Sequence, residues 1–315
     1  MNVPTPEQRI LGGLYGSLVG DALGVPVEFK PRADRIRDPV IDMRDYGTHG
    51  QPAGTWSDDG ALLLCSAESL IEKGFDTEDM GHRFVSWYAK GLWTAHGTIF
   101  DIGIATRKAL SLIEHGCPAE LAGGSDLYDN GNGSLMRILP VALAYHEQDT
   151  AIFCDRLSRA SSITHSHPRS QMACVFHGLL VRALMKDHTR ESALAEARHT
   201  FMELFSDSPE ITVFRDLLQA DLGSWDDSQV SSGGYVIETL TASLWCLLTT
   251  SSYSECILKA VNLGDDTDTT GCVAGGLAGV YYGLNALPEG WAAKLPRQEA
   301  LKNLFAQFTQ TLSLA

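Results

Sequence analysis

The segment TTGCVAGGLAGVYYG at residues 269–283 carries a glycine at every fourth position, and so does GGLYGSLVGDALG at residues 12–24. These glycines are Gly12, Gly16, Gly20, Gly24, Gly271, Gly275, Gly279 and Gly283. Residues four apart lie nearly in line on a helix, so each segment, if helical, has a strip of bare backbone along one face. Because glycine inside a helix costs roughly 1 kcal/mol relative to alanine, such a strip needs a compensating reason, and close backbone approach is the natural one. We predict two central helices that pack on each other through these glycines.

Apolar residues recur at helical spacing along most of the chain, and no alternating strand pattern is convincing. Helices are expected near residues 8–24, 59–73, 77–91, 101–115, 134–146, 150–160, 169–187, 190–205, 210–219, 235–250, 253–263, 269–284 and 298–312. Loops are expected at 30–56, 123–133 and 223–234, and none resembles a linker between domains. The sequence therefore predicts an all-α protein in which residues 1–315 form a single domain.

The formal net charge of −15 argues against a surface that binds nucleic acid or an anionic membrane, because both require basic groups. An anionic small ligand remains compatible with it. No apolar run is expected to reach the ~20 residues of a membrane span, and the N-terminus shows no signal-peptide pattern. The seven cysteines never form CxxC, so free thiols are expected. A cytoplasmic monomer is the resulting expectation.

Two acidic clusters stand at expected helix starts. Residues 57–59 are Ser-Asp-Asp, and residues 264–269 are Gly-Asp-Asp-Thr-Asp-Thr. Carboxylate and hydroxyl oxygens are the ligands that magnesium and manganese prefer, and Glu28 could add a further one. Helix capping is the alternative, since these residue types also accept hydrogen bonds from free N–H groups. Capping explains one acid per helix, whereas five acids at two helix starts repel one another unless cations are bound.

Two further motifs carry weaker signals. Residues 130–137, NGNGSLMR, form a small-residue loop that we expect to run into a helix, so a phosphate could approach the helix N-terminus with Arg137 as a charged donor. Asn-Gly is also a common turn signal, which leaves this interpretation open. In THSHP at residues 164–168, His165 and His167 could bind a metal, but histidine hydrogen-bonded to backbone at a helix end is the favoured interpretation.

Taken in order, these segments resemble the ADP-ribosylglycohydrolase family, which includes dinitrogenase reductase-activating glycohydrolases and ADP-ribosylarginine hydrolases. The resemblance covers nearly the whole chain. It rests on GDALGVPVEF (20–29), GTWSDDGALLL (54–64), DIGIATRKAL (101–110), GNGSLMRILPVAL (131–143), THSHP (164–168), SGGYVIETL (232–240) and NLGDDTDTTGCVAGGLAGVYYG (262–283). It implies a compact orthogonal helical bundle with two Mg²⁺ or Mn²⁺ ions at the bottom of an ADP-ribose cleft.

The resemblance also implies a role for particular residues. The implied metal ligands are Ser57, Asp58, Asp59, Asp266, Asp268 and Thr269, with Glu28 close to the ions. Asp265 is not among the implied ligands and could instead hold one of these ligands in position without touching the metal. The residues implied beside ADP-ribose are Asn132, Gly133, Ser134, Met136, Arg137, His165 and, stacked on adenine, Tyr235. Glu28, Asp58 and Asp59 are candidates for the catalytic base, and Asp101 is implied to contact the leaving group.

The resemblance implies a hydrolase that releases ADP-ribose from a modified protein, with arginine favoured by the DIGIAT motif at residues 101–106. An O-linked acceptor (serine, a nucleic-acid end or a polymer) stays open, and so does a toxin-immunity protein acting partly by binding its partner or a silent ADP-ribose binder. A prenyl-diphosphate synthase would also be helical, acidic and magnesium-dependent, but it requires DDxxD, whereas the acids here stand at 265, 266 and 268.

Overall fold

The computed structural model describes residues 3–314, and within them every regular element is a helix. The α-helices are α1 (Pro6–Gly24), α2 (Arg32–Arg37), α3 (Asp58–Lys73), α4 (Thr77–Lys90), α5 (Ile104–Glu114), α6 (Leu139–Tyr145), α7 (Thr150–Ser162), α8 (Pro168–Leu184), α9 (Arg190–Phe205), α10 (Arg215–Gln219), α11 (Val236–Leu248), α12 (Tyr253–Val261), α13 (Thr267–Tyr282), α14 (Glu289–Ala292) and α15 (Gln298–Leu314). Short 3-10 turns link several of them, and strand-like pairing within this range is limited to isolated bridges. The predicted all-α fold is confirmed.

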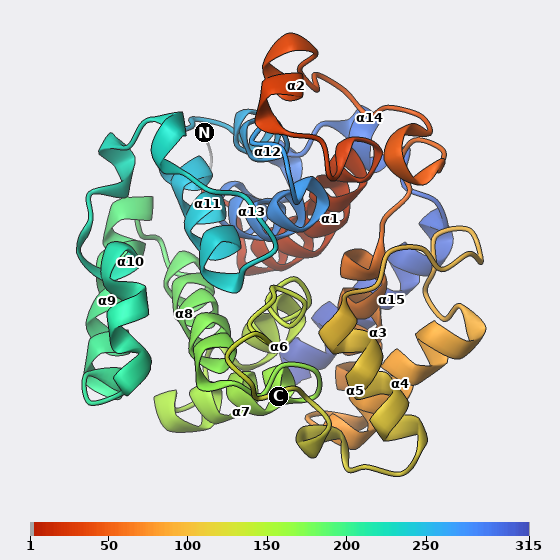
Figure 1. Cartoon of the computed structure of the whole chain (residues 1–315), viewed down its shortest axis with the longest axis vertical. Helices are drawn as coiled ribbons and strands as arrows, with labels where there is room; N and C mark the ends of the chain where they lie inside the picture. The colour runs from red at the N-terminus through yellow and green to blue at the C-terminus, as the bar shows by residue number, and fades with distance from the viewer. Residues whose placement is uncertain (1–2, 315) are drawn as a thin grey trace.

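The helices α1 and α13 lie side by side at the centre of the molecule, although they come from opposite ends of the chain (Figure 1). Their glycine strips face each other at backbone contact. A Cβ atom built on Gly20 would lie 1.9 Å from the carbonyl oxygen of Gly271, and one built on Gly275 would lie 2.1 Å from that of Gly16. Any larger side chain would separate the helices, so the predicted packing of the two glycine strips is confirmed.

The other helices surround this pair (Figure 1). The helices α11 and α12 pack on α13, while α3 and α15 contact α1 and each other. The helix α8 packs between α7 and α9, and α4 packs on α3. The phenol of Tyr253 on α12 donates a 2.8 Å hydrogen bond to the carbonyl oxygen of Gly16, so a third helix is tied directly to the glycine contact.

The segment Pro6–Val27 is long and apolar enough to cross a membrane by length and composition, with a mean hydropathy of 1.4. The sequence analysis did not anticipate this. In the fold, 89% of the apolar window is buried by other helices. Its apolar character is therefore accounted for by its place in the protein core.

Several predicted boundaries are wrong, each for a local reason. The helix expected from residue 134 begins only at Leu139, and residues 134–137 form turns. Pro140 lacks an N–H group and so suits the first turn of a helix. The helix expected from residue 101 begins at Ile104, and the segment 209–214 is a 3-10 helix. The short helices α2 and α14 were missed because so few residues carry too little periodicity.

We predict that Gly20→Ala lowers the free energy of unfolding by ~1–3 kcal/mol or more, because the new methyl group would overlap the backbone of α13. Urea unfolding followed by circular dichroism measures this change. Gly290→Ala in α14 is the matched control, since none of the described atoms would lie within 4 Å of its Cβ. A Gly20→Ala protein as stable as this control would mean that the contact is not tight.

Candidate metal centre

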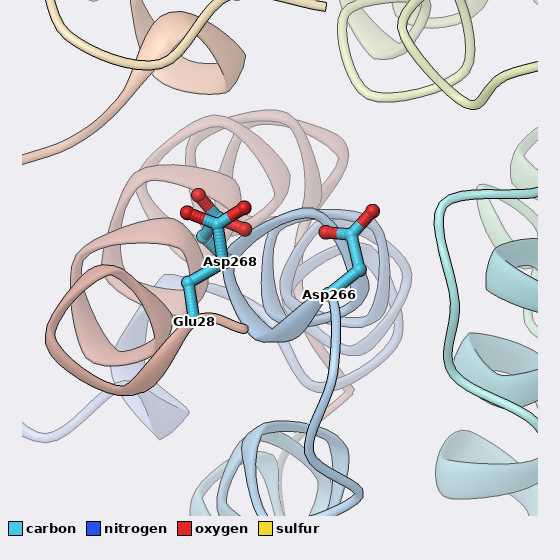
Figure 2. A group of neighbouring side chains, drawn as sticks. All are labelled: Glu28, Asp266 and Asp268. Carbon is cyan, nitrogen blue, oxygen red and sulfur yellow. The ribbon is translucent and has the colours of Figure 1, made fainter. Parts of the chain in front are cut away.

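The glycine contact brings three carboxylates from distant parts of the chain to one place. At the end of α1, a Cβ on Gly24 would lie 2.4 Å from the Cα atom of Asp268, so the end of α1 touches the start of α13. Glu28 follows α1 after the 3-10 turn Val25–Val27, while Asp266 precedes α13 and Asp268 lies in its first turn. These three residues offer oxygen atoms that all lie within 4.8 Å of one another (Figure 2). The expected meeting of Glu28 with Asp266 and Asp268 is confirmed.

A second group of acids enters from the start of α3. Ser57 is the N-cap of this helix, and Asp58 and Asp59 form its first turn. The Ser57 hydroxyl donates to Asp59 Oδ2 over 3.1 Å and accepts a bond from the Asp59 N–H group. All three residues are at most 3% exposed. The charge of Glu28 raises the pKa of Asp58, and that of Asp266 raises the pKa of Asp59, so both acidic clusters share one region.

Asp21 connects these two clusters and was missed as a functional residue by the sequence analysis. It is fully buried on α1, where its carboxylate accepts hydrogen bonds from the N–H groups of Ser57 at 3.0 Å and Gly60 at 2.8 Å. It thereby fixes the start of α3 against α1. One sequence signal was available: Asp21 is the sole charged residue between positions 10 and 27. A charge in such a helix requires buried partners.

Each of four acids has a buried oxygen that finds no hydrogen-bond donor among the described residues. These oxygens are Asp58 Oδ1, Asp59 Oδ1, Asp266 Oδ1 and Asp268 Oδ2. Burying such atoms without partners is costly, and capping cannot explain them because they cap nothing. Hard oxygen donors clustered in this way fit a divalent cation such as Mg²⁺ or Mn²⁺. The side chains of Ser57 and Thr269 are also buried here.

Burial and mutual repulsion make ionisation of this cluster unfavourable. Burial is the largest cause that raises the pKa values of Asp58, Asp59 and Asp268 well above the usual value, followed by the neighbouring acids. The pKa values of Asp21 and Glu28 are raised to about 7, again chiefly by burial. A bound cation reverses this effect because it stabilises the charged carboxylates.

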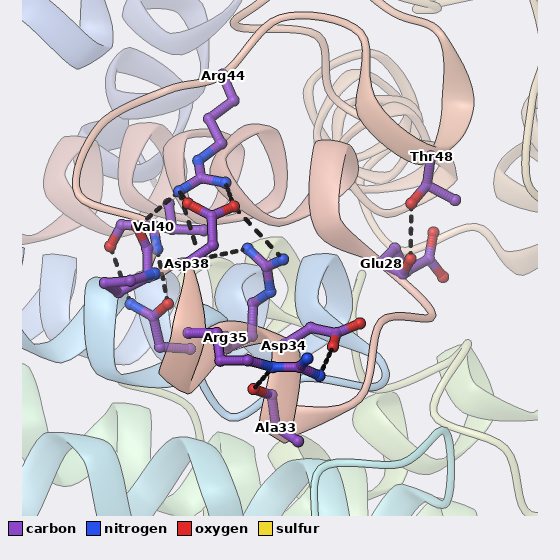
Figure 3. A network of polar contacts seen from close by, with 11 residues as sticks. Glu28, Ala33, Asp34, Arg35, Asp38, Val40, Arg44 and Thr48 are labelled. Atoms are coloured by element: carbon purple, nitrogen blue, oxygen red, sulfur yellow. Dashed lines mark hydrogen bonds and ion pairs between the residues drawn. The ribbon is translucent and has the colours of Figure 1, made fainter.

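Glu28 is held by a loop that sequence analysis did not single out. His49 Nε2 is hydrogen-bonded to Glu28 Oε2. The Thr48 hydroxyl donates to the Glu28 carbonyl oxygen over 2.8 Å (Figure 3). The pKa of His49 is raised, mainly by its hydrogen bond to Glu28. No motif in the sequence connects residues twenty positions apart, so only the fold shows this pair.

The same loop is tied down outside the site. Val40 and the side chain of Asn262 exchange hydrogen bonds of 2.8 and 2.9 Å, and Arg44 forms an ion pair with Asp38 (Figure 3). The position of His49 is therefore set by several independent contacts.

Asp101 lies at the margin of the acidic cluster. It precedes α5, is partly buried and adopts a left-handed backbone conformation with φ of +46°. Burial raises its pKa, and its charge in turn raises the pKa values of Asp58 and Glu28. Asp265, by contrast, has an exposed side chain, and its backbone pairs with Phe29 and Lys30 in hydrogen bonds of 2.7 and 2.8 Å. Its contribution is to hold the Glu28 segment beside α13 through the backbone.

The small-residue loop at 130–134 lies beside the acids. Asn132 donates from Nδ2 to Asp266 Oδ2 over 2.8 Å and to the Thr239 hydroxyl over 2.9 Å. A Cβ atom on Gly133 would lie 2.9 Å from the ring of His165 and 3.0 Å from the Thr106 hydroxyl. Asn132 therefore orients Asp266, and Gly133 is required by the close packing of the loop over His165.

Three other residues expected beside the ligand point into the protein. Ser134, Met136 and Arg137 are at most 4% exposed. The Arg137 guanidinium lies over the ring of Phe84 and donates to the Ala160 carbonyl oxygen and the Thr164 hydroxyl. The helix that was expected to follow this loop directly begins only at Leu139, so Arg137 does not stand at a helix N-terminus. Its Nε and Nη1 atoms are buried and have no acceptor among the described residues, and a contact between Arg137 and a phosphate stays a prediction.

The remaining expected ligand residues are placed differently. His165 is buried and hydrogen-bonded to the Thr164 hydroxyl, and burial lowers its pKa to about 3, so it is neutral. His167 caps α8 by accepting from the Arg169 N–H group. The helix-end interpretation of this histidine is confirmed. Tyr235 stands partly exposed at the start of α11, with the Arg169 guanidinium 5.8 Å from its ring centre.

Comparison with known proteins identifies one family over nearly the whole chain. The sequence model of the ADP-ribosylglycohydrolase family matches residues 2–314. The chain is 33% identical over 312 residues to an ADP-ribosylarginine hydrolase of Serratia proteamaculans, covering 96% of this chain and 80% of that protein. It is 30% identical to the ADP-ribosyl-[dinitrogen reductase] glycohydrolase of Rhodospirillum rubrum, covering 94% and 92%. A solved structure described as an ADP-ribosylglycohydrolase-related protein complex matches with a TM-score of 0.81 at 33% identity, covering 97% and 98%.

We predict that Mg²⁺ or Mn²⁺ raises the melting temperature of the protein. A cation that binds only the folded state, at a concentration of about 100 times its Kd, adds ~2.7 kcal/mol to the free energy of unfolding. Asp268→Asn should abolish most of this increase, and Asp207→Asn, an exposed acid on the far loop after α9, should leave it unchanged. Differential scanning fluorimetry measures the change. Equal metal-induced shifts in both variants would contradict the metal centre.

The metal-free protein should lose stability as pH rises. Asp21 and Glu28 have raised pKa values of about 7, so their protonated forms stabilise the fold at low pH and this contribution disappears as pH passes through that value. Urea unfolding in EDTA at about pH 5.5 and about pH 8 tests the sign. Metal added at the higher pH should restore the free energy of unfolding that was lost. A metal-free protein that becomes more stable as pH rises would contradict this prediction.

Proposed function

Because the chain belongs to the ADP-ribosylglycohydrolase family and is a hydrolase of ADP-ribose glycosidic bonds, we propose that it cleaves the N-glycosidic bond between ADP-ribose and an arginine side chain of a modified protein. Two Mg²⁺ or Mn²⁺ ions are proposed to bind at the acidic cluster. The observation that carries the arginine assignment is the likeness to a named ADP-ribosylarginine hydrolase over 96% of the chain. The proposed partners are an ADP-ribosylated protein as substrate and ADP-ribose as product.

The proposed metal ligands stand at the starts of α3 and α13, with Glu28 next to Asp266 and Asp268. They are Ser57, Asp58, Asp59, Asp266, Asp268 and Thr269. Support comes from the unpartnered carboxylate oxygens and from the way Asn132 and the α1–α13 contact hold these acids in place. When bound, divalent cations orient sugar hydroxyls and water and make that water easier to deprotonate.

The chain's own residues then provide orientation and proton transfer. Cleavage at C1″ of the ribose develops positive charge on the sugar, which the surrounding carboxylates stabilise. Glu28, Asp58 and Asp59 are the proposed candidates for the group that takes a proton from the attacking water. Glu28 is the best oriented of them, since His49 holds its carboxylate and Thr48 its backbone. Asp101 is proposed to contact the departing guanidine.

ADP-ribose is proposed to lie along the loop 130–134 and towards α11. Asn132 and Gly133 would lie beside the phosphates and the distal ribose. The ring of His165 packs against Gly133 from the protein interior. Tyr235 is the aromatic surface offered to adenine, because its ring is partly exposed at the start of α11. Ser134, Met136 and Arg137 are proposed to stand on the buried side of this loop, beside the phosphates and the distal ribose. The Nε and Nη1 atoms of Arg137 support this, because they have no acceptor among the described residues.

The acceptor class is tested by incubating the protein with arginine-, serine- and nucleic-acid-linked ADP-ribose, with Mg²⁺, Mn²⁺ or EDTA, and measuring release by mass spectrometry. We expect metal-dependent release from arginine alone. Asp58→Asn should lower kcat/KM on the order of 100-fold or more while the protein stays folded. Full activity in EDTA would exclude the metal mechanism, and release from serine or nucleic acid at equal rates would exclude the arginine assignment.

Tyr235→Ala should weaken ADP-ribose binding by ~1–3 kcal/mol, the contribution of stacking a base on an aromatic ring. Isothermal titration calorimetry of ADP-ribose with the metal-loaded protein measures it. Tyr235→Phe, which keeps the ring, is the matched control and should retain the affinity. An unchanged Kd in the alanine variant would place adenine elsewhere.

A further inference from the structure

Three aromatic rings form a continuous row beside the acidic cluster. The ring centre of His49 lies 5.9 Å from that of Phe29 and 5.1 Å from that of Phe100. Phe29 directly follows Glu28, and Phe100 directly precedes Asp101. The row is therefore built from three separate segments, each of which also carries or contacts an acid of the site.

The backbone at two ends of this row is held in an unfavourable conformation. Phe29 has φ of +60° and Asp101 has φ of +46°, in the left-handed region that non-glycine residues rarely adopt. Phe29 is kept there by the hydrogen bond from its N–H group to the Asp265 carbonyl oxygen. Its ring is consequently 63% exposed, although burial would be favourable for phenylalanine. Strain of this kind, kept at the exposed Phe29 and the partly buried Asp101 beside the site, indicates a role in binding.

The middle of the row, His49, is held in place by several contacts. One edge of the His49 ring is hydrogen-bonded to Glu28, its side chain is only 12% exposed, and the loop that carries it is fastened at Val40 and Arg44. The exposed Phe29 and the partly exposed Phe100 thus flank His49, and each is next in sequence to an acid of the site, Glu28 or Asp101. A ligand group placed there meets apolar faces on one side and acids on the other.

We propose that Phe29, His49 and Phe100 form the wall of the subsite for the leaving group, and that this wall with Asp101 selects a planar cation, the guanidinium of arginine. This inference rests on the proposed function and names the residues that set its acceptor preference. A guanidinium stacks on aromatic faces and forms paired hydrogen bonds with a carboxylate. A serine hydroxyl has no face to stack and no charge for Asp101 to balance, while the phosphate of a nucleic-acid end would be repelled by the acids.

The main test compares Phe29→Leu and Phe100→Leu with wild type, because leucine keeps apolar bulk and removes the aromatic face. Each variant should lose about tenfold in kcat/KM for arginine-linked ADP-ribose, mainly through KM. The Kd for ADP-ribose, which lacks the leaving group, and the metal-induced melting shift should stay at wild-type values. Phe100→Tyr, which keeps an aromatic face, should lose less activity than Phe100→Leu. Tyr88→Leu, at a 40% exposed aromatic residue on α4, is the control outside the site and should keep wild-type activity.

A second measurement does not depend on turnover. Agmatine, a free guanidine, should inhibit ADP-ribose release competitively and should bind the metal-loaded wild-type protein about tenfold more tightly than either leucine variant. Equal agmatine affinity in wild type and both variants, or none in wild type, overturns the aromatic wall even where arginine-linked substrate is hydrolysed. Wild-type protein that binds agmatine through this wall yet releases nothing from arginine overturns the proposed function instead.

Discussion

The contact between the backbones of α1 and α13 is the constraint on which the rest of the structure depends. Carbonyl oxygens of one helix occupy the positions where Cβ atoms of the other would stand, so the helix axes approach as closely as their backbones allow. This closeness has a direct chemical consequence. It places the end of α1 against the first turn of α13, and thereby brings Glu28 to Asp266 and Asp268, although some 240 residues separate these segments in the chain.

The site built on this contact opposes folding in the absence of a cation. Buried carboxylates from α1, α3 and α13 raise one another's pKa values, and several of their oxygens have no donor within the described part of the chain. The protein compensates with neighbours that fix the acids individually. Asp21 accepts hydrogen bonds from the start of α3, Asn132 donates to Asp266, and His49 is bonded to Glu28. Such preorganisation is what a catalytic centre requires, and it explains why stability and function compete at this place.

The candidate site could be predicted in part from sequence. The acids at 57–59 and 264–269 were recognisable because clustered carboxylates exceed what capping needs, and Glu28 because it follows a glycine helix. Asp21 was overlooked because it was considered only as an interruption of that helix. His49, Phe29 and Phe100 could not be grouped at all, since no periodicity links them. Arg137 was expected beside a phosphate because it follows a small-residue loop, and only the fold shows that it also lies over Phe84 and donates to Ala160 and Thr164.

The sequence by itself determined the helical class, the extent of most helices and the identity of the acidic residues, because helical periodicity and carboxylate clustering are local properties of the chain. It also determined that the two glycine helices pack together, because bare backbone at every fourth residue is destabilising unless another backbone covers it. Only the tertiary structure decided which oxygens meet, which side chains face the ligand and which face the core. Those properties depend on how far each helix rotates and where each one begins, and a shift of one residue turns a side chain on a helix by about 100°.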